Sequence, residues 1–183
     1  MKQTFYLVVV NREYKGMDGY YTASPLCTDK KDAENFLSKE FDKLSDEFSG
    51  FEGWEVERDD ETFTCIDYHN YNLWGWVEEI EVENDFTGHR FAFTIFSTSH
   101  IDGADDNDEL DVQIVFSDRQ SYRGDVEREI KKIVDRYKKE YPTATWGQTS
   151  DYKFSQTWEL MANFETDVEE GELNIWFEMH DII

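Results

Sequence analysis

Residues that interrupt a fold are scarce in this chain of 183 residues. It has only 2 prolines and 10 glycines, so no segment has the composition of a flexible linker or a low-complexity tract. No apolar run approaches the roughly 20 residues that span a bilayer. The short apolar run near the start passes directly into polar residues, unlike a signal peptide. We therefore expect a cytoplasmic protein that does not bind membranes.

Cysteine and recognisable catalytic motifs are also scarce. Cys27 and Cys65 lack CxxC spacing, and in the cytosol such a pair usually stays as two free thiols. There is no GxSxG, Walker or dinucleotide-binding motif, and the four histidines form no HExxH pattern. Cys65 and His69 would be roughly 13 Å apart along one strand, too far for a nucleophile and its base. The acidic run 101–111 does not fit the EF-hand pattern. We predict no enzymatic activity, no metal site and no cofactor.

Positive charge is scarce relative to negative charge. The chain has 42 acidic and 18 basic residues, a net charge of −24. Residues 1–88 carry 21 acids and 8 bases, and residues 89–183 carry 21 and 10, so neither half is a neutral body with an acidic tail. A surface this negative repels phosphates, which disfavours direct binding to DNA, RNA or anionic membranes. The expected partner is therefore a basic protein.

Two segments have helical periodicity. Residues 28–48 and 124–142 carry apolar side chains at three- and four-residue steps, with Asp29 or Thr28 able to cap the first and Pro142 to end the second. The remainder alternates as strands do, with candidates at 3–10, 19–24, 52–58, 62–69, 74–83, 90–98, 109–117, 153–164 and 172–180.

The order of these elements predicts an α+β fold, with largely antiparallel sheet and two amphipathic helices. The two halves look alike: a ββαβββ half in residues 1–88 and a ββαββ half in residues 89–183. This suggests an internal duplication, and we expect the halves to form one compact unit.

Charge is segregated along the chain. Eight bases lie on or next to the second helix, between residues 119 and 139. They could neutralise neighbouring acids, form a dimer contact, or touch a guide RNA held by a target, and the sequence does not decide among these roles.

The stretch VEEIEVEND, residues 77–85, is a predicted strand in which five of nine residues are acidic. Side chains alternate faces along a strand, so Glu79, Glu81 and Glu83 should share one face, about 6.5–7 Å apart. A DNA strand places one phosphate per ~3.4 Å of axis, and the path along the winding backbone is longer, so the two pitches are comparable. The simpler explanation is a solvated face that protects an edge strand. The predicted partner-binding residues are Glu78, Glu79, Glu81, Glu83, Asp85, Asp105, Asp106, Asp108, Glu109, Asp111, Glu169, Glu170 and Glu172.

In overall character the chain resembles phage-borne inhibitors of bacterial defence, which are anti-CRISPR and anti-restriction proteins of the DNA-mimic kind. It looks most similar to type II anti-CRISPR proteins directed at Cas9, on the basis of the acidic stretches VEEIEVEND, DGADDNDELD and ETDVEEGE. The resemblance implies a protein that occupies the basic DNA-binding channel of a Cas nuclease or its guide-RNA complex. It assigns no role to any single residue.

Three other functions remain open. An immunity protein that neutralises a basic toxin would have similar charge, and a neighbouring toxin gene would favour it. An acidic protein-interaction domain without inhibitory role would also fit. An enzyme with a non-standard site would need a buried carboxylate of raised pKa, which sequence alone does not reveal.

Overall fold

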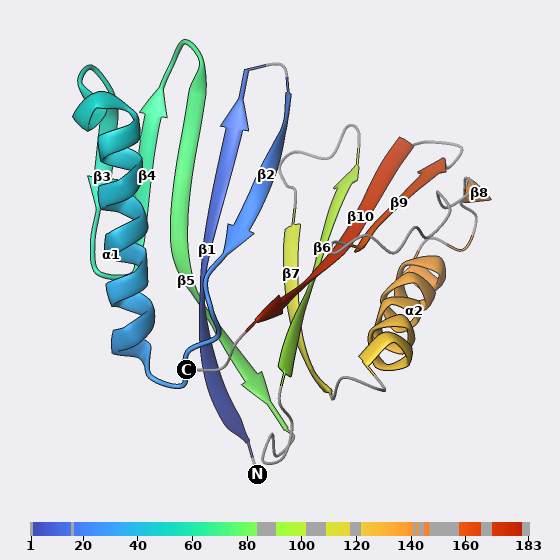
Figure 1. Cartoon of the computed structure of the whole chain (residues 1–183). Helices are drawn as coiled ribbons and strands as arrows, with labels where there is room; N and C mark the ends of the chain where they lie inside the picture. Colours follow the sequence, from blue (N-terminus) through green and yellow to red (C-terminus); the bar gives the residue numbers. More distant parts are fainter. Residues whose placement is uncertain are drawn as a thin grey trace. The chain divides into compact units, whose positions relative to one another are not determined.

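A computed structural model describes residues 2–15, 17–83, 91–101, 109–117, 122–140, 142, 145–146, 158–165 and 170–180. The chain divides into two compact units, residues 1–85 with 181–183 and residues 86–180. Each unit combines one long helix with an antiparallel sheet, which confirms the α+β fold class (Figure 1). The boundary that we expected between residues 88 and 89 lies outside the described residues.

The first unit is a five-stranded antiparallel sheet with one helix on its face. Its strand order is β2-β1-β5-β4-β3. The elements are β1 (Gln3–Tyr14), β2 (Met17–Ala23), α1 (Lys30–Glu47), a 3-10 helix η1 (Ser49–Phe51), β3 (Glu55–Arg58), β4 (Thr62–Asp67) and β5 (Tyr71–Val82). Hairpins join β3, β4 and β5, and β5 then pairs with β1 along the full length of both strands.

The second unit has the same topology. Its strand order is β7-β6-β10-β9-β8, so each strand occupies the position of its counterpart five strands earlier. The elements are β6 (Phe91–Ile101), β7 (Glu109–Ser117), α2 (Tyr122–Glu140), β8 (Thr145–Trp146), β9 (Trp158–Glu165) and β10 (Glu170–His180). The first strand after α2, β8, has two residues and was not predicted, because so short a strand carries no alternating pattern.

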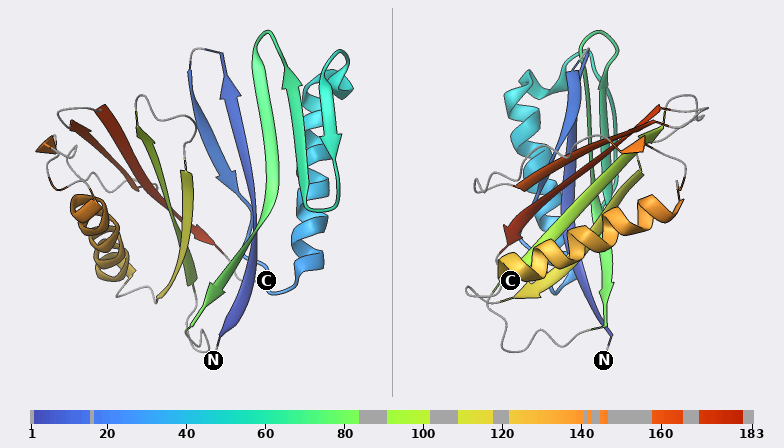
Figure 2. Two further views of the ribbon diagram at one scale, coloured as in Figure 1. Left: turned by 180° about the vertical axis from the view of Figure 1, so that it is seen from behind. Right: turned by 90° about the vertical axis from the view of Figure 1, so that its right-hand side faces the viewer.

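Helix α1 begins and packs where its sequence pattern indicates. Asp29 is its N-cap, and its Oδ1 accepts a hydrogen bond of 2.7 Å from Lys31 N. Ala33, Leu37 and Leu44 are buried in a core with residues of β1, β4 and β5. Burying these apolar groups is the main stabilising term of the unit. Figure 2 shows each helix running along its own sheet.

Helix α2 packs in the same way in its own unit. Val126, Ile130, Ile133 and Tyr137 are buried against a cluster on β6 and β10, with further partly buried residues around it. The cluster partners on the two strands are Phe93, Ile95 and Ile175. The helix ends at Glu140, two residues before Pro142, as the missing N–H of proline favours.

Candidate acidic interface

The carboxylate row of β5 is the best-defined part of the predicted interface. Glu79, Glu81 and the following Glu83 are all exposed. They have the same parity along the chain as Leu73 and Val77, which face the core under α1. The face of β5 therefore changes from apolar to acidic towards the C-terminal end of the strand.

Pairing with β1 explains why glutamates, which have a low strand propensity, are accommodated in β5. The β1–β5 register is continuous from Gln3↔Val82 to Tyr14↔Tyr71, so the main chain of the acidic segment is held by a full ladder. On the opposite face Ile80 and Val82 are half-buried. Tertiary context thus overrides the weak strand propensity of glutamate.

Glu78 lies on the other face of β5 and has a local partner. Its Oε2 accepts a hydrogen bond of 2.8 Å from Trp76 Nε1, and both side chains are partly buried. Trp76 in turn makes an edge-to-face ring contact with Tyr21. Glu78 therefore does not extend the row formed by Glu79, Glu81 and Glu83.

Two lysines partly compensate the row. Lys2 Nζ lies 2.7 Å from Glu81 Oε2, and the hydrogen bond with Glu81 raises the pKa of Lys2. Lys30 Nζ lies 2.8 Å from Glu61 Oε1. The pKa of Lys30 is raised chiefly by its hydrogen bond to Glu61, with a smaller contribution from the charge of Glu79. Counting charges along the sequence missed both lysines, because the fold brings in Lys2 from just before β1 and Lys30 from the start of α1.

The structure describes only some of the predicted partner-binding acids of the second unit. Asp111 on β7 is paired with the basic helix, since Arg136 of α2 lies 2.8 Å from its Oδ2. Register places Glu109 opposite Ser99 and Glu172 opposite His100, so the main chains of two distant acidic stretches meet at one end of this sheet. Glu170 begins β10 at the same end. Outside the described residues lie Asp85, Asp105, Asp106, Asp108 and Glu169.

Some of the bases of α2 form ion pairs within their own unit. Three of them form ion pairs: Arg128 with Asp125 at 2.9 Å, Lys132 with Glu129 at 2.7 Å, and Arg136 with Asp111 at 2.8 Å. Of the roles that the sequence left open, neutralisation of neighbouring acids therefore has direct support. These pairs are largely exposed, so each contributes little to stability.

The sequence predicted strands at 52–58 and 62–69, where β3 and β4 lie, but the acids of this hairpin were not among the predicted partner-binding residues. All four residues of β3 are exposed, including Glu55 and Glu57. In the connecting turn, Asp59 Oδ1 accepts hydrogen bonds from Glu61 N at 2.8 Å and from Thr62 N at 2.7 Å. These two bonds lower the pKa of Asp59. The run EVERDDE, residues 55–61, was the available signal, since its acids alternate as those of β5 do.

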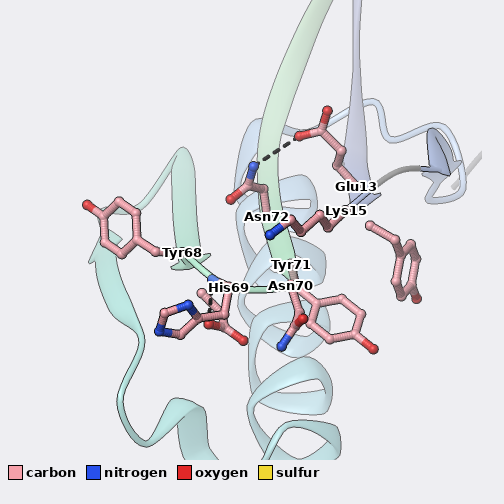
Figure 3. Close-up of a pocket in the computed structure, with 9 residues that line it drawn as sticks. Glu13, Lys15, Tyr68, His69, Asn70, Tyr71 and Asn72 are labelled. Carbon is pink, nitrogen blue, oxygen red and sulfur yellow. Dashed lines mark hydrogen bonds between the residues drawn. The ribbon is translucent and has the colours of Figure 1, made fainter.

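A shallow hollow of about 380 Å³ lies beside the turn between β4 and β5 (Figure 3). Asp67 Oδ1 accepts a hydrogen bond of 3.1 Å from His69 N, so this carboxylate holds the turn. His69 and Tyr68 line the hollow, whereas Cys65 is buried in the core and does not. Burial raises the pKa of the Cys65 thiol to about 11. Cys65 therefore does not share a site with Asp67 and His69, which both line the hollow.

Cys27 and Cys65 are free, as we predicted, and both are buried. Within the described part of the chain, no three His, Cys, Asp or Glu side chains are grouped so as to hold a metal ion. No helix there has the length and apolar character needed to cross a membrane.

No family model, curated protein or solved structure matches this chain.

Proposed function

We propose that this protein is an acidic inhibitor that binds the basic nucleic-acid-binding surface of a defence nuclease, such as a type II Cas nuclease with its guide RNA. The observation that carries the proposal is the exposed row of Glu79 and Glu81 on one face of β5 with Glu83 directly after the strand. The row belongs to a chain with a net charge of −24.

The spacing of the row supports this choice of partner. Alternate residues on a strand advance about 6.5–7 Å, a pitch that a groove built to follow phosphates can match. Lysine and arginine side chains in such a groove would exchange phosphate for carboxylate with similar release of counterions. The large net charge would also speed the encounter with a basic partner. Binding of this kind blocks DNA binding or cleavage by occupying the channel.

The local cations limit how much of the row is available. Glu81 forms an ion pair with Lys2, so Glu79 and Glu83 supply most of the uncompensated negative charge of the row. A charge reversal at these two positions is therefore the sharpest test. Asp46 and Glu52, which are exposed in the same unit, allow a reversal of equal charge at other positions.

The experiment measures cleavage of target DNA by a guide-loaded type II Cas nuclease in the presence of each variant. Wild type and D46K/E52K should inhibit at similar concentrations, whereas E79K/E83K should need at least about tenfold more protein, as expected when close charge pairs are lost. If E79K/E83K inhibits as well as D46K/E52K, the row does not form the interface. If the wild-type protein does not inhibit any such nuclease, the proposed target class is wrong.

A further inference from the structure

The outer edge of β3 has main-chain groups that point away from the sheet. Two main-chain hydrogen bonds fix their direction: Asp59 N donates to Thr62 O, and Val77 N donates to Glu61 O. In an antiparallel ladder, hydrogen-bonded and non-hydrogen-bonded pairs alternate. With the observed register, Glu55 and Glu57 face β4 with their main chains, and the N–H and C=O groups of Val56 and Arg58 face outward.

Nothing among the described residues pairs with this edge. β3 is the last strand in the order β2-β1-β5-β4-β3, and all four of its residues are exposed. Val56 is 39% exposed although it is apolar. An open edge with an exposed apolar side chain is a template for strand addition.

The side chains of β3 determine which kind of peptide strand can pair with this edge. Val56 is paired with the buried Cys65, so it lies on the face that α1 covers, and Glu55 and Glu57 lie on the opposite face. A second copy of the same edge would bring these glutamates close to like charges, which opposes self-pairing. A strand with lysine or arginine on that face and an apolar residue on the other would be attracted.

We propose that β3 binds an extended basic peptide segment of a partner protein, which adds to the first sheet as a strand beside β3. Its basic residues would lie next to Glu55 and Glu57, and an alternate apolar residue would contact Val56. Four main-chain groups, the N–H and C=O of Val56 and Arg58, would form the new ladder. This surface is separate from the row on β5, so it is independent of the proposed function.

The test uses the full chain and a synthetic peptide of alternating lysine and valine. A second peptide, with proline in place of each valine, keeps the charge but loses the N–H groups at those positions. On the protein side, V56P removes an N–H that lies outside the β3–β4 ladder, a position where edge strands tolerate proline. V56A is the matched control, because it shortens the side chain and keeps the N–H. Binding is measured by NMR titration and by hydrogen exchange of the Val56 and Arg58 amides.

The first peptide should bind, protect both amides from exchange, and bind V56P about tenfold more weakly than V56A. The proline peptide should bind about tenfold more weakly to the wild-type protein, a result that does not depend on whether V56P folds. Equal binding of the two peptides would overturn the proposal, because charge alone would then explain the affinity. A concentration-dependent dimer that V56P abolishes would overturn it in favour of a second copy at this edge.

Discussion

Lys2 Nζ lies 2.7 Å from Glu81 Oε2, an ion pair that joins the start of the chain to the acidic end of β5. The pairing of β1 with β5 brings the two residues together. Both side chains are more than half exposed, so the pair is a weak source of stability. Its larger effect is to remove one charge from the row of Glu79, Glu81 and Glu83.

The variant K2A should therefore strengthen inhibition without changing the unfolding midpoint. Freeing Glu81 gives the row one more uncompensated charge to offer to a basic partner. K39A is the control, because Lys39 is exposed on α1 and its loss changes the net charge equally. Inhibition of the nuclease is measured with both variants. An equal gain from K39A and K2A would mean that net charge acts and the row does not.

Two glycines should respond to alanine in opposite directions. A Cβ at Gly75 would lie 2.6 Å from Phe63 Cζ in the core, whereas a Cβ at Gly124, near the start of α2, would meet nothing within 4 Å. G75A should lower the free energy of unfolding by about 1–3 kcal/mol through overpacking. G124A should raise it by about 0.5–1 kcal/mol, because alanine favours a helix over glycine. Urea unfolding measures both. An unchanged G75A would contradict the packing described for β4 and β5, and a destabilised G124A would contradict the open space at Gly124.

The turn at Asp59 predicts a pH dependence. Hydrogen bonds from the Glu61 and Thr62 N–H groups lower the pKa of this carboxyl in the folded state below 3.8. The resulting stabilisation is present above the unfolded pKa and is lost as pH falls through the folded pKa. D59N cannot titrate, so its free energy of unfolding should fall less steeply than that of wild type below about pH 4. D60N is the control, because it removes the same charge at the adjacent position. Identical pH profiles for D59N and wild type would exclude the role assigned to Asp59.

The two thiols should be unreactive in the native protein. Both side chains are in the core, and burial is the main reason that the pKa of Cys27 and that of Cys65 are raised to about 11. The thiolate is the reactive species, so at pH near 8 neither should react with an aromatic disulfide reagent on a time scale of minutes. In denaturant both should react at once. Rapid reaction of one thiol under native conditions would place it outside the core.

The sequence predicted the features that depend on local periodicity. The expected helices at 28–48 and 124–142 correspond to α1 at Lys30–Glu47 and α2 at Tyr122–Glu140. The alternation of acids in β5 also gave the exposed face correctly, because a strand's side-chain period is fixed.

Features that depend on which strands are neighbours were not predictable. The charges of Lys2 and Arg136 reach Glu81 and Asp111 only through tertiary pairing, so counting along the chain overstated how many acids are uncompensated. The position of β3 at the end of the first sheet, among the strands that the structure describes, follows from the strand order, which composition does not reveal. The expected strand at 62–69 ends at Asp67, because the carboxyl of Asp67 binds His69 N in the turn.

The salt dependence of binding to a guide-loaded Cas nuclease tests the central claim most directly. The affinity of the wild-type protein should fall linearly on a log–log plot between about 50 and 300 mM salt, as it does when a basic groove exchanges counterions. The slope should be clearly smaller for E79Q/E81Q/E83Q, which keeps the shape of the row and removes its charge. Equal slopes and equal affinities for this variant and the wild type would contradict the account.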